Sequence, residues 1–571
     1  MNKLLLVSFL FGLIASATIT TSDLQSAINS ASPGDIIEVK AGVYSSCSFT
    51  LKSGTKGKPI TIRAVKNAKV IFSGTSSQCI FDGYGYQYVN IEGPFELKNA
   101  MCGARLHGSQ YVNISGLTVH DVQQQGILVS GHYNNIIGNT VYNCVLENKS
   151  YAKSREYGWG QCVAVWGTGN SQMSTNIVFK NNKIYNGYGE GLDFLECDTC
   201  SAIGNEITNG FSMNIYIDVS RNILVEGNVL RVTSTAYDTK WGSACGVGLA
   251  PESGSIHIEN VVIKNNVMIG TRMGVYFFTF GSGGYNNIKI LHNTLWKVTV
   301  APIWFRPATN NPKGNELINN FIWYDNAIDA ISSSSWTVKN NFYYNVYNVP
   351  SQYPGENQMS AQTLDINSIF YNKGNCNYND MNMDAECLRP SKNPGYLHLY
   401  HGGATPVTKV ATDFSGCTRS STTPSVGAFE YSEGCGNDDP DTTDSTEESD
   451  TTNPDETEYD VKFRINYCTS GSQVVKLVGA HCSWSVGTCT ALTNEGSCYW
   501  STTISKGTEK TFAYKFVIAN GSSAYRWESD PNRTFDGPTL KTAATNSASG
   551  TYEKCSYVKS GNTITLVCTW R

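Results

Sequence analysis

Asparagine and glycine residues recur at nearly constant intervals along this 571-residue chain. The intervals are 23 residues and later 27, and the recurring positions are Gly93, Gly116, Asn139, Asn182, Asn205, Asn228, Asn266, Asn293 and Asn320. Most of them follow a short run of alternating apolar residues, which is typical of a strand that ends in a sharp turn, because Asn and Gly tolerate a positive φ. Such a period is one coil of a parallel β-helix. We therefore predict an all-β solenoid in which asparagines of successive coils stack into a hydrogen-bonded ladder.

Both ends of the repeat region carry signals for caps. Residues 23–35 read DLQSAINSASPGD, which predicts a short helix, and residues 36–44 predict the first strand. Residues 426–431, VGAFEY, predict a closing strand. Solenoids need such caps because an open coil leaves strand edges unpaired. Leucine-rich repeats have a similar period, but the Leu framework that they require is missing from this sequence.

Residues 18–435 resemble the right-handed parallel β-helix proteins, a superfamily that includes pectate lyases, chondroitinase B, alginate lyases and alginate epimerases. Similarity to the chondroitinase B and alginate lyase branch rests on DLQSAINSASPGDIIEVKAGVY at 23–44 and KGKPITIRA at 56–64. The resemblance implies action on polysaccharides, in lyases by removal of the proton α to a uronate carboxylate, with Ca²⁺ neutralising that carboxylate. This fold hosts many activities and also inert binders, so the fold alone does not give the function.

Two intervals in the repeat are longer than one coil. Asn139 and Asn182 are 43 residues apart, and Asn228 and Asn266 are 38 residues apart. Extra residues in a solenoid emerge as loops, usually on the binding face. The charged and aromatic residues of these insertions are Lys153, Arg155, Glu156, Tyr157 and Trp159 in the first and Arg231, Tyr237, Asp238, Lys240 and Trp241 in the second. This mixture suits a polysaccharide groove, and ordinary solvated loops are the alternative interpretation.

Acidic residues recur between these two insertions. Counting from the ladder asparagines places Asp193 and Tyr216 at equivalent points of adjacent coils. We therefore expect one face of the solenoid to gather Gln161, Glu190, Asp193, Tyr216 and Asp218. Neighbouring carboxyl groups shift one another's pKa values, so they can perform acid–base catalysis, and they can also hold Ca²⁺. In the alternative, Asp193 and Asp218 only form hydrogen bonds to turns of the coil.

The predicted catalytic residues combine these carboxyl groups with bases from the insertions. They are Glu190, Asp193, Asp218, Arg155 and Lys153, and the family mechanism, in which Lys or Arg is the base, adds Arg221 and Lys240 as further candidates. No metal ligand is assigned, and the Asp pair and Gly-His-Gly pattern of polygalacturonases are absent from the sequence.

A second group of motifs, near the C-terminus, contains the residue types that a sugar site needs. The triplet YKF at 514–516 is followed by WESDPNR at 527–533. A pyranose ring stacks its apolar face on an indole and presents its hydroxyls to amide and carboxylate groups. Trp527 is expected to supply the stacking face. The expected hydrogen-bonding residues are Lys515, Glu528 and Asn532.

From about Tyr459 to the C-terminus the chain resembles the starch-binding domain of family 20 carbohydrate-binding modules. The resemblance rests on Trp484, Trp500, YKF and WESDPNR in that order. It implies a small immunoglobulin-like β-sandwich in which Trp484 and Trp527 form a paired platform for a starch- or glycogen-like α-glucan. We interpret Trp500 as a core residue. Asn532 also begins the N-glycosylation pattern Asn-Arg-Thr, and a glycan there would block the amide assigned to binding.

Composition divides the chain into segments. Residues 1–17 have a charged start, an apolar run and a small-residue cleavage site, which is typical of a secretory signal peptide. The β-helix domain is expected at 18–435, an acidic Thr-rich linker at 436–459 and the starch-binding domain at 460–571. The linker composition cannot bury a core and extends by self-repulsion, so it is expected to act as a tether.

Cysteines and charge indicate the compartment and the partners. Twelve of the 18 cysteines precede the linker and six follow it, and even counts in a secreted chain favour disulfides within each domain, including Cys197 with Cys200, over metal or redox sites. A net charge of −5 without a basic run argues against nucleic acid, and no later apolar run is long enough to span a membrane. Further N-glycosylation patterns occur at Asn113, Asn148 and Asn520. We expect a secreted, glycosylated monomer.

These observations together predict a secreted carbohydrate-binding protein. The C-terminal module is expected to bind a starch- or glycogen-like α-glucan, and the β-helix to bind and cleave a polysaccharide, as a lyase or a hydrolase. No cofactor is assigned, and Ca²⁺ is the one candidate. The alternative is a non-catalytic adhesin or wall protein in which both domains only bind. A third reading is a surface recognition protein without an α-glucan ligand, which applies if Asn532 is glycosylated.

Overall fold

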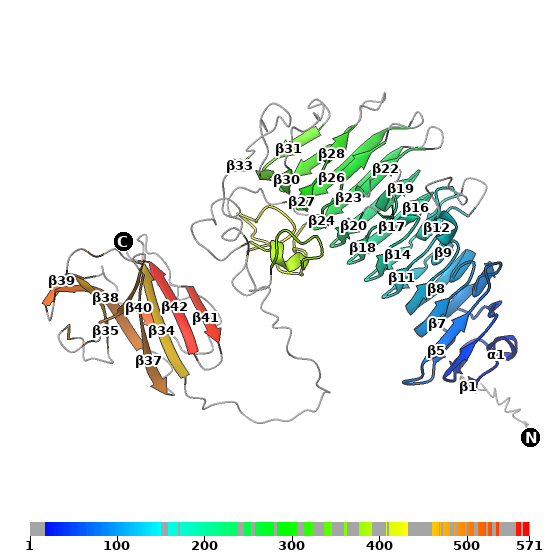
Figure 1. The fold of residues 1–571 in the computed structure, drawn as a ribbon, viewed down its shortest axis with the longest axis horizontal. Coiled ribbons are helices and arrows are strands. Elements are labelled where there is room, and N and C mark those ends of the chain that lie inside the picture. The colour runs from blue at the N-terminus through cyan, green and yellow to red at the C-terminus, as the bar shows by residue number, and fades with distance from the viewer. Residues whose placement is uncertain are drawn as a thin grey trace, which may run out of the picture. The chain divides into compact units, whose positions relative to one another are not determined.

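The chain forms two compact units, Met1–Asp439 and Pro440–Arg571 (Figure 1). The computed structural model describes residues 17–149, 158–168, 172–234, 236–237, 245–252, 257–278, 283–305, 313–324, 336–344, 359–361, 370, 376–390, 407, 410–431, 459–466, 469, 472–479, 485–486, 489, 491–496, 499–507, 512–520, 523–527, 533–535, 556–560 and 563–569. The predicted signal peptide and linker, apart from Ala17 and Tyr459, lie outside these residues.

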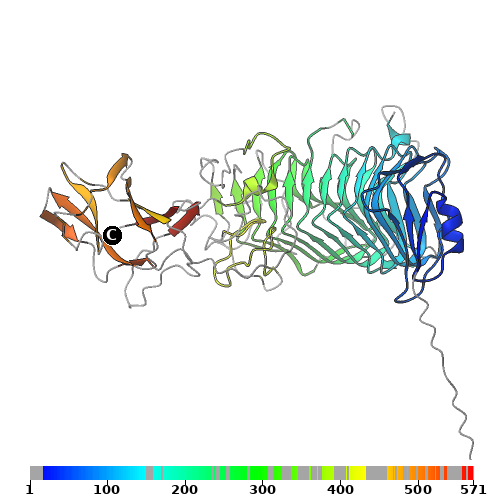
Figure 2. The ribbon, with the colours of Figure 1, turned by 90° about the horizontal axis from the view of Figure 1, so that it is seen from below.

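Three parallel sheets form the first unit, and its coils follow one another along the length of the unit (Figure 2). Sheet A consists of β6 (Phe81–Tyr84), β8 (Ala104–His120), β9 (Ile127–His132), β12 (Gln161–Trp166), β16 (Glu190–Leu195), β19 (Met213–Asp218), β22 (Cys245–Ala250), β25 (Met273–Phe277) and β28 (Ala301–Phe305). Each strand in this order pairs in parallel with the next.

Sheet B follows sheet A within a coil. Its strands are β1 (Thr18–Thr21), β2 (Ile36–Val39), β4 (Ile60–Ala64), β7 (Gln87–Lys98), β10 (Asn135–Ile137), β14 (Val178–Lys180), β17 (Cys197–Ile203), β20 (Arg221–Glu226), β23 (Ile258–Lys264), β26 (Tyr285–Leu291), β29 (Asn315–Ile318) and β31 (Trp336–Lys339). The long strand β8 turns the corners and takes part in all three sheets, because its residues pair in succession with β9, β10 and β11.

Sheet C closes the coil. Its strands are β3 (Gly42–Tyr44), β5 (Val70–Ser73), the second half of β7, β11 (Thr140–Tyr142), β15 (Lys183–Tyr185), β18 (Glu206–Thr208), β21 (Val229–Arg231), β24 (Val267–Ile269), β27 (Thr294–Val298), β30 (Phe321–Tyr324), β32 (Phe342–Tyr344) and β33 (Met359–Ala361). The short strand β13 (Ser174–Thr175) pairs with β9 and β17. The predicted all-β solenoid is therefore confirmed.

A ladder of buried asparagines joins the coils at the turn between sheets B and C. Each side-chain Nδ2 donates to the Oδ1 of the next asparagine at 2.9 or 3.0 Å, in the order Asn139, Asn182, Asn205, Asn228, Asn266, Asn293, Asn320 and Asn341. The predicted ladder is confirmed, with one difference in detail. The positive φ belongs to the residue before each ladder asparagine, for example Gly204 at 64°. Gly116 occupies in its coil the position that Gly138 occupies in the next coil. The early glycines of the repeat therefore correspond to the residue before the ladder asparagine, not to the asparagine itself.

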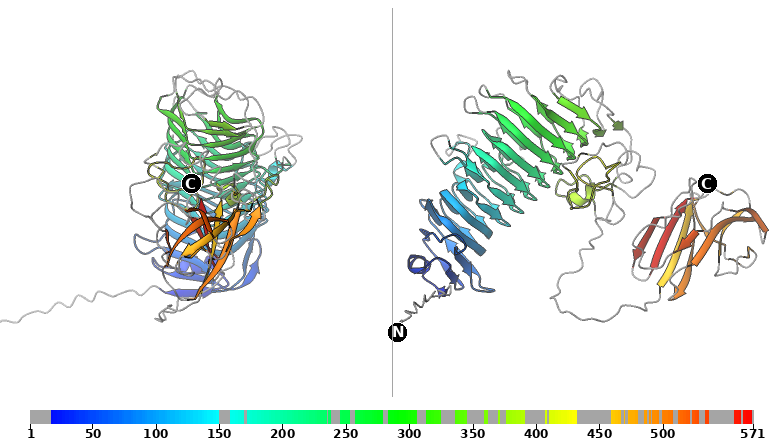
Figure 3. Two further views of the ribbon diagram at one scale, coloured as in Figure 1. Left: turned by 90° about the vertical axis from the view of Figure 1, so that its left-hand side faces the viewer. Right: turned by 180° about the vertical axis from the view of Figure 1, so that it is seen from behind.

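The predicted N-terminal helix is confirmed, but the first strand is β1, which precedes it, and residues 36–44 form β2 and β3. The predicted C-terminal cap is not found. Helix α1 (Leu24–Ser30) begins at Asp23, whose side chain accepts from the Ser26 N–H, and it lies at the N-terminal end of the coils (Figure 3). Residues 426–431 are not a strand, so that prediction is wrong. Side chains satisfy their backbone instead: Ala428 N donates to Thr294 Oγ1 at 2.8 Å, and Glu430 N donates to Asp413 Oδ2 at 2.8 Å. Short 3₁₀ helices occur at η1 (Leu146–Asn148) and η3 (Ala385–Leu388).

Disulfide bonds cross-link the first unit at several of its coils. They join Cys79 to Cys102, Cys144 to Cys162, Cys197 to Cys200 and Cys376 to Cys387. The Cys197–Cys200 prediction is confirmed. The expectation that the even cysteine count is used up in pairs does not hold, because Cys47 is a buried free thiol, and burial raises its pKa to about 11. An even count cannot reveal that a cysteine lacks a partner within reach.

The second unit has two sheets. The first contains β36 (Thr493–Gly496), β37 (Tyr499–Gly507), β34 (Tyr459–Asn466), β42 (Thr563–Thr569) and β41 (Ser556–Ser560), in that order. The second contains β35 (Val474–Gly479), β38 (Phe512–Asn520) and β39 (Ser523–Trp527), with β40 (Arg533–Phe535) also paired to β38. Trp500 is only 5% exposed, which confirms its interpretation as a core residue.

Candidate functional site

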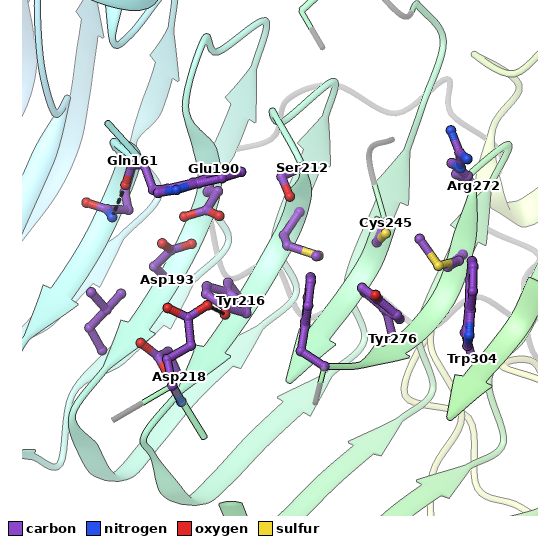
Figure 4. Close-up of a pocket in the computed structure, with 16 residues that line it drawn as sticks. Gln161, Glu190, Asp193, Ser212, Tyr216, Asp218, Cys245, Arg272, Tyr276 and Trp304 are labelled. Atoms are coloured by element: carbon purple, nitrogen blue, oxygen red, sulfur yellow. Dashed lines mark hydrogen bonds between the residues drawn. The ribbon is translucent and has the colours of Figure 1, made fainter. Parts of the chain in front are cut away.

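A pocket of about 720 Å³ opens on the outer face of sheet A, across β12, β16, β19, β22, β25 and β28. Figure 4 shows Glu190, Asp193, Asp218 and Tyr216 toward one end of this pocket, and Tyr276 and Trp304 toward the other. The acidic residues among the described lining are Glu190, Asp193, Asp218 and Glu252. The aromatic residues are Trp159, Tyr216, Tyr276, Phe278 and Trp304.

Strand register brings the acidic residues together as the sequence predicts. Gln161 pairs with Glu190, and Asp193 pairs with Tyr216 on the next coil. Asp218 lies two residues beyond Tyr216 on the same strand, beside Leu195. All of these side chains line the one pocket, so the predicted gathering of carboxyl groups is confirmed, whereas their catalytic role stays a prediction.

Asp193 is a carboxyl group without exposed surface. Burial raises its pKa well above the usual range, and the negative charges of Glu190, Asp218 and Glu252 raise it further. No hydrogen bond of normal length and angle reaches either of its oxygens from the described residues. Protonation lowers the cost of burying this group, so the folded protein favours the protonated form of Asp193.

Asp218 is the more accessible acid. Burial and the neighbouring Glu252 charge raise its pKa to about 7, although the Glu252 N–H donates to its Oδ1 at 3.1 Å and opposes that rise. The Tyr216 hydroxyl donates to Glu252 Oε1, and burial keeps the pKa of Tyr216 above its usual value, so this hydroxyl stays protonated. One end of the pocket thus combines a buried acid with a raised pKa, an acid that titrates near neutrality and the exposed carboxyl group of Glu252.

Glu252 is a residue that the sequence analysis missed. It lies just after β22, in the long interval that was assigned to a loop. The signal that could have found it is its place directly beyond a strand of sheet A, two residues after the position that pairs with Asp218.

The other end of the pocket is apolar and aromatic. The Tyr276 ring is 5.5 Å from the Trp304 ring and 4.0 Å from the Phe278 ring, measured between centroids. Met213, Cys245 and Met273 complete this surface. Trp159 is 54% exposed at the acidic side, which leaves its indole accessible. Such surfaces suit the apolar faces of sugar rings.

None of the predicted bases is among the described residues that line the pocket. Lys153, Arg155 and Lys240, and with them Glu156, Tyr157, Asp238 and Trp241, lie outside the described residues. Arg221 lies on sheet B, where its Nε is 2.8 Å from Asp198 Oδ2, so its prediction as a base of this site is wrong. Arg231 lies on sheet C in an ion pair with Glu206, so that insertion residue is not at the pocket either. Arg272, which was not predicted, is the one cation among the described lining residues.

The predicted sugar-binding residues of the second unit are only partly described. Trp484, Glu528 and Asn532 lie outside the described residues. Lys515 on β38 is 7% exposed. The backbone of Trp527 on β39 pairs with Val517, two residues along β38 from Lys515. The roles of all five residues stay predictions.

Three further predictions, on Ca²⁺, on a membrane span and on N-glycosylation, concern residues that the structure describes in part. Among the described residues, no group of three His, Cys, Asp or Glu side chains is arranged to hold a metal ion, so the Ca²⁺ prediction gains no ligand set there. The described helices include none with the length and apolar character needed to cross a bilayer. Of the described N-glycosylation patterns, Asn148 is 1% exposed with Nδ2 donating to Gly158 O at 3.3 Å, whereas Asn520 is exposed.

Two family models match successive parts of the first unit. Residues 18–100 match the family described as chondroitinase B, and residues 102–295 match the right-handed β-helix region. The first unit is a right-handed β-helix. Residues 458–547 match the family described as the starch binding domain, so the second unit contains a starch-binding domain. No curated protein matches the chain.

Solved structures similar to the chain include both enzymes and an adhesin. An alginate lyase from Paenibacillus sp. is 20% identical over 48% of this chain and 99% of that chain, with a TM-score of 0.32. The pectate lyase Pel9A is 15% identical over 74% and 98%, with a TM-score of 0.40. PfbA, a surface adhesin of Streptococcus pneumoniae, is 10% identical over 57% and 86%, with a TM-score of 0.41.

Proposed function

We propose that the protein is a secreted glycan hydrolase that cleaves a neutral polysaccharide in the sheet A pocket and holds α-glucan through its starch-binding domain. The observation that carries the proposal is the gathering of Glu190, Asp193, Asp218 and Glu252 in one pocket that also offers aromatic surfaces. Glycoside hydrolysis uses a pair of carboxyl groups, one as acid and one as base or nucleophile, around a transition state with positive charge.

The charge of the pocket favours a hydrolase over a lyase. A lyase substrate carries a uronate on each reacting sugar, and its carboxylate must be neutralised by a cation before the α proton is removed. The described lining offers four carboxyl groups and the single cation Arg272. Even with Asp193 and Asp218 protonated, Glu190 and Glu252 outnumber that cation, so the described lining disfavours a polyanionic chain. A neutral chain meets no such repulsion, and the cationic transition state of hydrolysis is stabilised by the same carboxylates.

Each acidic residue has a distinct role in this proposal. Asp218 is the general acid, because a pKa of about 7 keeps a proton available at slightly acidic to neutral pH. Glu190 is the base or nucleophile, since it lines the pocket one coil away. Asp193 has no exposed surface and so acts as a positioning residue that keeps its proton and limits the negative charge beside Glu190.

Secretion and α-glucan binding rest on separate observations. Disulfides form and persist in oxidising compartments, and this chain has several of them. The starch-binding domain match supports a starch- or glycogen-like ligand, for which Trp484, Lys515, Trp527, Glu528 and Asn532 remain the proposed contacts. A tethered binding domain raises the local concentration of polysaccharide at the pocket.

An Asp218→Asn variant tests the catalytic part. We expect reducing-end release from a panel of neutral polysaccharides to fall on the order of a hundredfold or more, the range that general acid catalysis supplies. Activity of the unchanged protein should also decline as pH rises through about 7, because Asp218 then loses its proton. Glu226→Gln, which removes a carboxylate paired with Lys264 on sheet B, is the matched control. Equal activity of Asp218→Asn and the unchanged protein contradicts the proposal, and a folded, starch-binding protein that cleaves no member of the panel supports the binding-only alternative.

A further inference from the structure

A second cavity, of about 460 Å³, opens near the N-terminal end of sheet A. Its walls include Asp82, Tyr84 and Tyr86 from the β6 region and Arg105 and His107 from β8. This cavity is separate from the acidic pocket, whose described lining begins with residues at β12.

Tyr84 provides an exposed aromatic surface at this cavity. It is 73% exposed, the most open of the large hydrophobic side chains described. Glycine makes room for its ring on the neighbouring coil, because a Cβ on Gly108 would lie 2.8 Å from Tyr84 Cζ. The ring is therefore supported by the backbone of the next coil while much of it faces solvent. An indole or phenol ring held in this way suits the apolar face of a sugar.

The polar groups beside Tyr84 form a charge-compensated pair. Arg105 donates two hydrogen bonds to Asp82, from Nε to Oδ1 at 3.1 Å and from Nη2 to Oδ2 at 2.8 Å. The carboxylate keeps lone pairs that can accept further hydrogen bonds, which is what a sugar hydroxyl requires. Burial lowers the pKa of His107, so its imidazole is neutral at pH 7 and both donates and accepts. A cavity with these groups is complementary to a neutral, hydroxyl-rich ligand.

Register aligns this cavity with the acidic pocket. Asp82 pairs with Arg105, Arg105 with Leu128, Leu128 with Ala164, and Ala164 with Asp193, each on the next strand of sheet A. Arg105 and Asp193 are thus three strands apart on one row, about 14 Å at the usual strand spacing. The His107 ring also lies 6.0 Å from the Trp166 ring on β12, the strand that carries Gln161 of the acidic pocket.

We propose that the cavity at Tyr84 is a distal sugar-binding subsite, which holds one unit of a neutral polysaccharide chain whose other units reach the acidic pocket by passing over Leu128 and Ala164, which are covered. The inference rests on the proposed function for the kind of ligand, and it extends that function to a preference for chains long enough to reach both sites. Short oligosaccharides occupy the acidic pocket alone.

Affinity electrophoresis of the full chain tests the subsite without relying on cleavage. The parent protein carries Asp218→Asn, to prevent hydrolysis, and Trp527→Ala, to weaken binding by the starch-binding domain. Native gels contain glycogen, pullulan or laminarin. Adding Tyr84→Ala should raise the dissociation constant on the order of threefold to tenfold in the gel that retards the parent most, the range that one aromatic contact gives. Tyr84→Phe keeps the ring and should bind like the parent, and Tyr133→Ala removes a tyrosine, 48% exposed and outside the described lining, as the matched control.

The outcomes separate this inference from the proposed function. Equal retardation of the parent and Tyr84→Ala, or no retardation of the parent in any gel, overturns the subsite. Weaker retardation of Tyr84→Ala together with undiminished hydrolysis by Asp218→Asn keeps the subsite and overturns the catalytic assignment. In the otherwise unchanged protein, Tyr84→Ala should slow cleavage of long chains and leave cleavage of trisaccharides unaltered.

Discussion

At the scale of single residues, Asp193 is the most unusual group in the pocket, because its buried carboxyl lacks a normal hydrogen bond from the described residues. Such a group remains neutral in the folded protein and ionises freely in the unfolded chain. The unfolded state therefore gains stability relative to the folded state as pH rises above about 4, the usual pKa of an aspartate. Asp193 thus makes the protein less stable with rising pH, up to its raised folded-state pKa.

Replacement of Asp193 by Asn removes this pH-dependent cost. We expect Asp193→Asn to raise the melting temperature at about pH 8 and to change it much less at about pH 4, where the aspartate is protonated in both states. Differential scanning calorimetry at the two pH values measures the effect. A lower melting temperature of the variant at the higher pH would mean that ionised Asp193 has a stabilising partner.

At the scale of structural elements, the buried asparagine ladder holds successive coils together. Asn205 donates to Phe179 O at 3.0 Å and to Asn228 Oδ1 at 2.9 Å, and it accepts from the backbone and side chain of Asn182, both at 2.9 Å. Its neighbours are buried, so loss of the amide leaves their polar groups without water as a substitute.

We expect Asn205→Ala to destabilise the β-helix by about 3 to 5 kcal/mol, since several buried hydrogen-bonding groups lose their partners at once. Asn135→Ala is the control, because Asn135 is partly exposed and its Nδ2 makes one hydrogen bond, to Asn113 Oδ1 at 2.7 Å. Its loss should cost about 1 kcal/mol or less. Denaturant titration followed by tryptophan fluorescence compares the two variants, and equal destabilisation would show that the inner ladder adds no special stability.

The period of the asparagines was enough to predict the coil, the ladder and part of the site. It placed Asp193 beside Tyr216, because each coil between Asn182 and Asn228 has the same length of 23 residues. The same count could have excluded Arg221, which lies 23 residues after Asp198 and pairs with it on sheet B. Glu252 could not be found in this way, because the coil before it contains an insertion, so its distance from Asp218 is 34 residues.

Features that depend on contacts between side chains of different coils could not be predicted from the sequence either. The sequence at 426–431 predicts a strand. In the structure its backbone N–H groups instead donate hydrogen bonds to the side chains of Thr294 and Asp413, which lie far from it in the sequence. The cavity at Tyr84 depends on Gly108 leaving space one coil away. Neither relation follows from a local pattern, because both require the packed fold.

At the scale of the whole molecule, two units with different folds are joined in one chain, one with a candidate catalytic pocket and one with a starch-binding domain. Tethering turns binding by one unit into a high local concentration of polysaccharide for the other. The gain is greatest for insoluble or branched material and absent for small soluble substrates, which diffuse to the pocket freely.

Trp527→Ala in the full chain should abolish retention on insoluble starch and leave hydrolysis of short soluble oligosaccharides unchanged. The physical reason is loss of the stacking face on which the sugar ring is expected to lie. Arg526→Ala, an exposed neighbour on β39, is the control and should be retained. Sedimentation with starch granules measures both variants, and full retention of Trp527→Ala would refute the assignment of this tryptophan to the α-glucan site.

Hydrolysis of a neutral polysaccharide is the central activity proposed for the sheet A pocket. Mass spectrometry of the products formed in oxygen-18-labelled water measures this directly. We predict one labelled oxygen at each new reducing end, where water adds to the anomeric carbon, none at the new non-reducing end, which keeps the glycosidic oxygen, and no labelled product from the Asp218→Asn variant. Products without label that carry a carbon–carbon double bond would identify a lyase and contradict the account.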